Sequence, residues 1–136
     1  LDQLKIAGYS YNWMIDRDGT RYQLVENTEG SVHTDNERNR SSYGVAFMYS
    51  GPRDDYNKKP GDIYAPIPGT VPDWGSAWWA PYTSDQVASA AQLVRELGAD
   101  KSWYLIGHQD VNENKSDPGP AFPWADFERQ SGLRRA

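Results

Sequence analysis

The chain has 136 residues, no cysteine and a formal net charge of −5 at pH 7. This length fits one compact domain, and a chain without cysteine has no disulfide framework. The acidic balance and the shortness of the basic clusters argue against nucleic acid as a partner. No apolar run approaches the roughly 20 residues that cross a bilayer, so no membrane segment is expected.

The N-terminal residues predict the last turns of a helix over residues 1–7, capped by Gly8. Because such a start is typical of a point inside a domain, we expect the domain to lack its N-terminal strand and part of its first helix. Residues 9–16 and 20–26 alternate and are rich in aromatic and β-branched types. They predict a β-hairpin around a polar turn that ends in Gly19.

The middle of the chain divides into three segments. Residues 27–42 are polar and predict a loop, whereas the mostly apolar run 43–49 predicts a buried central strand. Residues 52–82 hold most of the prolines and show no sustained periodicity, but their aromatic content argues against free disorder. We therefore expect an ordered flap over one face, with three tryptophans: Trp74, Trp78 and Trp79.

The C-terminal part alternates helices and strands. A periodic apolar pattern predicts a helix between an N-cap at Ser84 and a closing Gly98. Residues 102–107 predict another buried strand, and Pro123 begins a last short helix over 124–131. The chain is therefore predicted to form a single α/β domain, with a central mixed β-sheet flanked by helices.

Candidate chemistry is concentrated after the predicted strand 102–107. His108 lies where open α/β sheets place ligand-binding groups, and Asp117 follows nine residues later before a stiff Pro-Gly-Pro turn. Histidine and carboxylate together suit zinc, with Asp110 as a candidate to orient the imidazole and Lys115 as a candidate oxyanion stabiliser. Spacing alone also fits a hydrogen-bonded surface pair, so the residues by themselves leave both interpretations open.

Three blocks of the sequence are informative together: YNWMIDRDG at 11–19, SVHT at 31–34 with the residues up to Val45, and GHQDV with KSDPGPAFPW at 107–124. These blocks resemble the type-2 N-acetylmuramoyl-L-alanine amidase family, which includes amidase-type phage endolysins and peptidoglycan recognition proteins. They occur in the family's order, and the resemblance spans roughly residues 8–127. The resemblance implies one amidase domain over residues 1–136, with the 52–82 flap as its least familiar part.

The resemblance also implies roles for individual residues. His108 is similar to the second zinc-ligand histidine of the family and Asp117 to the third ligand. Lys115 resembles the lysine that faces the substrate carbonyl, and Tyr11 resembles the tyrosine that orients the attacking water. Some members place a glutamate on the strand that matches residues 43–49, where this chain has Ala46. The expected substrate contacts are His33, Asn39 and Trp13.

The first zinc ligand of the family is a histidine on a strand that would precede Leu1, and this chain contains only His33 and His108. A catalytic zinc needs three protein ligands and an open position. Three interpretations follow. The missing ligand is supplied by an N-terminal segment or a separate chain, His33 replaces it, or the protein has lost zinc and binds peptidoglycan without cleaving it.

The resemblance implies a zinc-dependent peptidoglycan hydrolase that cleaves the amide between N-acetylmuramic acid and L-alanine of the stem peptide. Its partner would be peptidoglycan or a muropeptide. It would act at the bacterial cell wall, either as a secreted autolysin or as a phage endolysin released at lysis. The alternatives are a non-catalytic recognition module on the same fold and a regulatory interaction surface built on the tryptophan-rich flap.

Overall fold

The computed structural model describes residues 11–24, 43–49, 51–53, 67–71, 75–97 and 103–136. The helix end expected over residues 1–7 and the polar segment 27–42 lie outside this part of the chain, and so does Trp74. No described helix is long and apolar enough to cross a membrane.

The predicted hairpin is confirmed, with shorter strands. Strands β1 (Trp13–Ile15) and β2 (Arg21–Gln23) pair antiparallel, and β3 (Val45–Phe47) pairs parallel with β1, giving the order β2-β1-β3. The run 43–49 does form a strand, but it is not the central one of this sheet. That place belongs to β1, whose Ile15 is fully buried, whereas the three residues of β3 are only half-buried.

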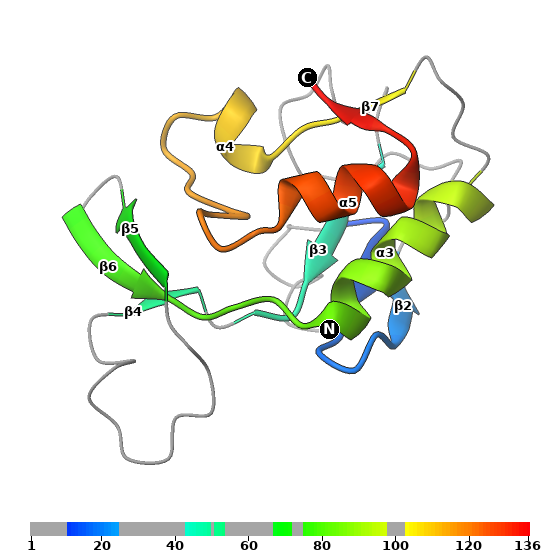
Figure 1. Ribbon diagram of the computed structural model, residues 1–136, viewed down its shortest axis with the longest axis horizontal. Helices are drawn as coiled ribbons and strands as arrows, with labels where there is room; N and C mark the ends of the chain where they lie inside the picture. Colours follow the sequence, from blue (N-terminus) through cyan, green and yellow to red (C-terminus); the bar gives the residue numbers. More distant parts are fainter. Residues whose placement is uncertain (1–10, 25–42, 50, 54–66, 72–74, 98–102) are drawn as a thin grey trace.

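Two helices build the core over this sheet. Helix α3 (Ser84–Glu96) lies beside α5 (Trp124–Ser131), and both pack with β1 residue Ile15 into one apolar cluster (Figure 1). Val87 and Leu93 of α3 are each 2 % exposed, and burial of such a side chain stabilises the fold by about 1.5–3 kcal/mol.

The start of α3 differs from the prediction by one residue. The N-cap is Thr83 rather than Ser84, because the Thr83 hydroxyl accepts from the backbone N–H of Gln86 at 3.1 Å. The Gln86 side chain accepts from the Thr83 backbone N–H in return, which completes a capping box. Gln86 is fully buried, and its side-chain amide also donates to the Met48 carbonyl at 2.8 Å, which ties α3 to the residue after β3.

The sequence predicted an ordered flap over residues 52–82 but no strands within it, and the described residues of this segment do contain strands. They form an antiparallel sheet of order β4-β6-β5, from Pro52–Arg53, Gly75–Trp79 and Ile67–Val71. This sheet lies to one side of the helices (Figure 1). Trp79 at its end is 1 % exposed, so this flap tryptophan is a core residue and not part of an interaction surface.

The last elements also correct the sequence interpretation. Strand β7 (Tyr104–Leu105) is shorter than expected and not buried, since Tyr104 is 63 % exposed. It pairs parallel with β8 (Arg134–Arg135). His108 does not end the strand but begins a short helix, α4 (His108–Val111). The α/β class thus holds, with three small sheets among the described residues, and a single central sheet remains a prediction.

Candidate functional site

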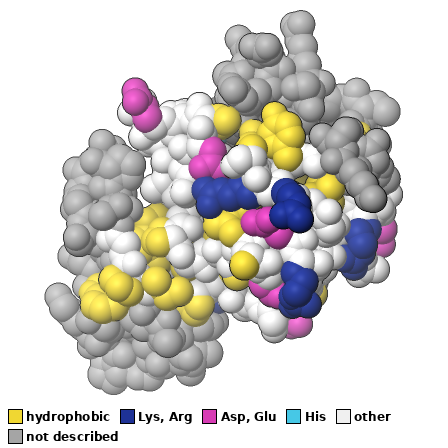
Figure 2. Space-filling view, turned by 45° about the horizontal axis from the view of Figure 1, so that its top comes forward, with side chains coloured by type: hydrophobic (Ala, Val, Ile, Leu, Met, Phe, Trp, Pro, Cys, Tyr) yellow, Lys and Arg dark blue, Asp and Glu magenta, His cyan; other side chains and the backbone are white. Residues whose placement is uncertain are grey.

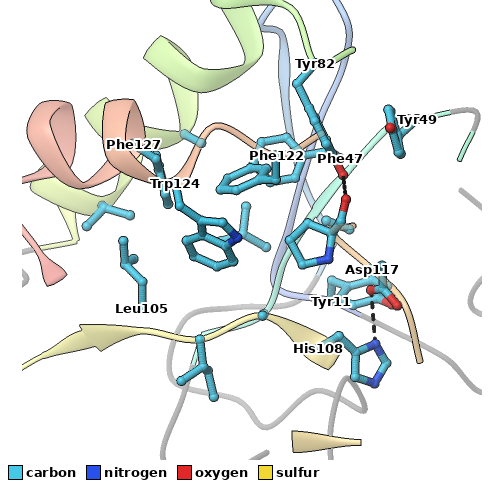
Figure 3. A pocket seen from close by; sticks show the side chains of 18 of the residues that line it. Tyr11, Phe47, Tyr49, Tyr82, Leu105, His108, Asp117, Phe122, Trp124 and Phe127 are labelled. Atoms are coloured by element: carbon cyan, nitrogen blue, oxygen red, sulfur yellow. Dashed lines mark hydrogen bonds and ion pairs between the residues drawn. The ribbon is translucent and has the colours of Figure 1, made fainter. Parts of the chain in front are cut away.

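His108 and Asp117 lie side by side, as the sequence predicts. The Nδ1 atom of His108 is 3.1 Å from Oδ2 of Asp117 (Figure 3). Helix α4 begins at His108, and the loop after it folds back towards the helix. As a result the Gln109 backbone N–H donates to the Asp117 carbonyl at 2.9 Å. The Asp117 side chain is 58 % exposed, so a substrate or ion in solvent can reach the pair.

The turn after Asp117 is packed against the second sheet. Pro118 follows through a cis peptide, and Gly119 has φ +82°. A Cβ on Gly119 would lie 2.7 Å from Cε3 of Trp79, so the buried indole occupies the space that any side chain there would need. The absence of a side chain at residue 119 therefore lets the sheet approach the Asp117 turn.

The electrostatics of the site keep Asp117 ionised. Partial burial raises the pKa of Asp117, but the hydrogen bond and charge of His108, a backbone hydrogen bond and the charge of Lys115 together hold it below its usual value. Lys115 is exposed and near enough for its charge to act on Asp117. The net effect is a carboxylate available as a ligand at neutral pH.

Tyr11 is the third group at this end of the site. Its ring lies beside Asp117 (Figure 3), and burial together with the Asp117 charge raises the pKa of its phenol. Tyr11 therefore keeps its proton at neutral pH and can donate a hydrogen bond to a ligand oxygen. Sequence similarity pointed to Tyr11, and the structure brings it together with His108 and Asp117.

A cavity of about 700 Å³ extends from this cluster into the molecule. Its volume is in the range of about 300–1,000 Å³ typical of ligand pockets. His108, Asp117 and Tyr11 line it, and apolar side chains from β3, α3, β7 and α5 are among its other lining residues. Ala46 is among the lining residues, so the position that matches the family's glutamate does face the cavity.

Other predicted residues lie elsewhere. Trp13 is half-buried and packs against the core cluster of α3 and α5, so a substrate contact for it stays a prediction. Asp110 does not orient His108. Its carboxylate accepts from the Gly107 backbone N–H at 2.8 Å and pairs with Arg135 at 2.8 Å. The remaining two predicted substrate contacts, His33 and Asn39, are outside the described residues.

Two residues that contact the Asp117 turn were missed. Tyr82 donates its phenol proton to the Pro118 carbonyl at 2.7 Å, and Gln109 accepts from the Gly119 backbone N–H at 3.0 Å. Gln109 stands next to His108 in the motif GHQDV, so adjacency was an available signal. For Tyr82 no signal existed, because it approaches the turn from 36 residues away.

The His108–Asp117 pair fits part of a zinc site. Nitrogen and oxygen donors at usual bond lengths on a tetrahedral zinc lie about 3.4 Å apart, close to the 3.1 Å found here. No group of three or more histidine, cysteine or acidic side chains able to hold a metal ion occurs among the described residues. The third protein ligand would come from outside them.

On the face seen in Figure 2, basic and acidic side chains are interspersed, and the described residues form no broad basic patch there. Two of the ion pairs of the described chain are Arg135–Asp110 and Arg129–Asp126. This face therefore offers no extended field of one sign to a polyanion.

Comparisons with known proteins gave one match. A family model described as N-acetylmuramoyl-L-alanine amidase matches residues 2–120. The search of curated proteins and the search of solved structures each found no match. The matched range contains the hairpin, the second sheet, helix α3 and the His108–Asp117 pair.

Proposed function

The chain belongs to the N-acetylmuramoyl-L-alanine amidase family, and from this premise we propose that it hydrolyses peptidoglycan with the help of a zinc ion. The bond cleaved is the amide between the lactyl group of N-acetylmuramic acid and L-alanine. The observation that carries the proposal is the His108–Asp117 pair, 3.1 Å apart, beside Tyr11 at a cavity of ligand size.

His108 and Asp117 would hold the zinc, with a third ligand from outside the described residues. His33 is the one other histidine in the chain. A zinc ion held there would lower the pKa of a bound water towards about 7 and would polarise the scissile carbonyl. The low pKa of Asp117 favours this role, because a ligand carboxylate has to be ionised.

The other residues of the site would act on the substrate directly. The protonated Tyr11 phenol donates a hydrogen bond that orients the attacking water. The Lys115 ammonium would offset the negative charge that develops on the carbonyl oxygen. Water adds its oxygen to the lactyl carbonyl carbon, the carbon–nitrogen bond breaks, and the L-alanine nitrogen leaves with a proton.

Zinc-dependent hydrolysis is tested on purified bacterial cell walls with the intact protein. We expect stem peptides with free L-alanine N-termini, identified by mass spectrometry, to appear with time. A chelator should abolish their release and added zinc should restore it. Binding to the walls without any release would contradict the proposal and would leave a peptidoglycan-recognition module.

The bacterial cell wall is the proposed place of action, because the substrate is found there. Secretion or release at phage lysis would each bring the protein to it. A lysis assay in which the protein is either added outside intact cells or produced inside them would separate these routes. Hydrolysis of isolated muropeptides but not of intact walls would instead favour a recycling enzyme.

A further inference from the structure

Three successive residues of the Asp117 turn make backbone hydrogen bonds to Gln109 or Tyr82. The Asp117 carbonyl accepts from the Gln109 backbone N–H at 2.9 Å, and the Pro118 carbonyl accepts from the Tyr82 phenol at 2.7 Å. The Gly119 backbone N–H donates to the Gln109 side-chain oxygen at 3.0 Å. Two residues, Gln109 and Tyr82, therefore make all three of these hydrogen bonds with the turn.

The Tyr82 ring is itself fixed by its neighbours. It stacks on Tyr49, with ring centroids 4.1 Å apart and planes 13° apart, and meets Phe47 and Phe122 edge-on. Burial, with the Tyr49 and Asp117 side chains nearby, raises the pKa of Tyr82, so its phenol stays a donor throughout the physiological range. The hydroxyl thus points to the Pro118 carbonyl from a ring packed against three aromatic neighbours (Figure 3).

Gln109 connects the two halves of the candidate zinc pair. It follows His108 in helix α4, and both its backbone and its side chain bind the turn that carries Asp117. A shift of the turn relative to α4 would strain or break these hydrogen bonds. Gln109 and Tyr82 therefore both restrain the turn on which the separation of His108 and Asp117 depends.

We propose that Tyr82 and Gln109 are positioning residues that hold the Asp117 carboxylate opposite the His108 imidazole in the geometry a zinc ion requires. This inference rests on the proposed function, since the ion is the ligand that the pair would share. Neither residue is assigned a contact with substrate. Groups that orient metal ligands through hydrogen bonds change metal affinity or activity by about 10- to 100-fold when they are removed.

The test uses two variants: Tyr82→Phe removes the phenol hydroxyl, and Gln109→Leu removes the side-chain amide group. Gln109→Glu is the rescue variant, because it keeps an oxygen that can accept from Gly119. Tyr22→Phe, on strand β2 and away from the cavity lining, is the matched control for loss of a phenol. The readouts are zinc affinity, kcat and KM on muropeptide, and amide hydrogen exchange of Gln109 and Gly119 in the metal-free protein.

We expect Tyr82→Phe and Gln109→Leu each to weaken zinc binding and lower kcat by about 10-fold or more, with KM little changed. Exchange at the backbone amides of residues 109 and 119 should accelerate in both variants, whereas amides of α3 and α5 keep wild-type rates. Gln109→Glu should restore slow exchange at Gly119, and Tyr22→Phe should match wild type in every readout.

The outcomes separate this inference from the proposed function. Wild-type zinc affinity and exchange in both variants, in a protein that does bind zinc, would overturn the positioning role and leave the hydrolase intact. If the wild-type protein binds no zinc, the proposed function fails. The inference is then overturned with it, even where exchange shows that the turn is held. Uniformly faster exchange across the whole chain would indicate a general structural role and would also overturn it.

Discussion

At the scale of single residues, the proposed chemistry depends on a proton that Tyr11 keeps. Because burial and the charge of Asp117 raise the pKa of its phenol, Tyr11 is a neutral hydrogen-bond donor at neutral pH. Tyr11→Phe removes the donor and keeps the ring, so we expect kcat to fall roughly 10²-fold with KM nearly unchanged. Steady-state release of stem peptide measures both constants. Wild-type turnover would remove Tyr11 from the mechanism.

The proposed role of Lys115 is electrostatic and depends on the positive charge of its ammonium group. Its side chain is exposed, but the charge reaches Asp117 and would reach a carbonyl oxygen bound there. Lys115→Ala should lower kcat roughly 10²-fold, as loss of an oxyanion-stabilising donor does. Lys115→Arg, which keeps the charge, should lose less. Equal kcat for the alanine variant and the wild type, measured on the same muropeptide, would exclude this role.

The residues of the site that sequence could predict are those close together in the chain. His108 and Asp117 are nine residues apart, and a loop of that length returns on itself, so their meeting was predictable. Asp110 was misassigned because sequence proximity to His108 suggested contact. A distant residue, Arg135, pairs with its carboxylate instead. Local spacing shows which groups can meet but not which competing partner is present.

At the scale of elements, the N-terminus of α3 provides a direct test of structure against sequence. The structure makes Thr83 the cap, with a second hydrogen bond from its hydroxyl to the Arg17 carbonyl at 2.6 Å. Thr83→Ala should therefore lower the free energy of unfolding by about 1–2 kcal/mol. Ser84→Ala, at an exposed first helical position, should change it by less than about 0.5 kcal/mol. Urea unfolding of both variants measures the difference, and the reverse order would favour the sequence assignment.

The contact between α4 and β8 should show in the pH dependence of stability. Burial raises the pKa of Asp110, but the hydrogen bonds from Arg135 and Gly107 lower it by more. The pKa of Asp110 in the folded state therefore lies below its value in the unfolded state. Stability from Asp110 is then present above an unfolded pKa of about 3.9 and is lost as the pH falls through the folded value. The stability difference between wild type and Asp110→Asn should be constant above about pH 5 and shrink below it. A difference that grew on acidification, in urea unfolding across this range, would contradict the assignment.

Helices and strands could be predicted where their apolar pattern extends over many residues. Helix α3 has apolar residues at helical spacing over 13 residues, so its existence and face were clear from sequence. Strand β5 contains Pro68 and Gly69 and shows no alternation that could be recognised, while β7 was predicted over residues 102–107 but has only two residues. These strands exist because tertiary contacts fix them, and such contacts override weak local preference.

At the scale of the whole molecule, the second sheet supports the candidate site. Trp79 ends β6, and its buried indole packs between Gly69 of β5 and Gly119 of the Asp117 turn. A Cβ at Gly69 would lie 2.8 Å from Cδ1 of Trp79, so both glycines allow the same close approach. The tryptophan-rich segment and the glycine turn could both be recognised in the sequence. Their packing, with Trp79 against Gly119, could not. Such docking joins residues 40 positions apart and leaves no local periodicity.

Gly119→Ala tests this docking, with Gly132→Ala as its matched control. Both glycines have a left-handed backbone, φ +82° and φ +79°, so an alanine at either position has a similar conformational cost. At Gly132 a Cβ would meet nothing within 4 Å among the described residues, whereas at Gly119 it would press into the Trp79 ring. The extra loss of unfolding free energy in Gly119→Ala over Gly132→Ala therefore isolates the packing conflict, which we expect to be about 1–3 kcal/mol.

The same pair of variants links the sheet to the site. Because the turn that Gly119 occupies also carries Asp117, Gly119→Ala should weaken zinc binding as well as stability. Gly132→Ala, at the end of α5, should lower stability alone. Calorimetric unfolding and zinc titration of each intact variant give the two quantities. Equal stability losses would show that Trp79 does not constrain the turn, and unchanged zinc affinity in Gly119→Ala would show that the second sheet has no part in placing Asp117.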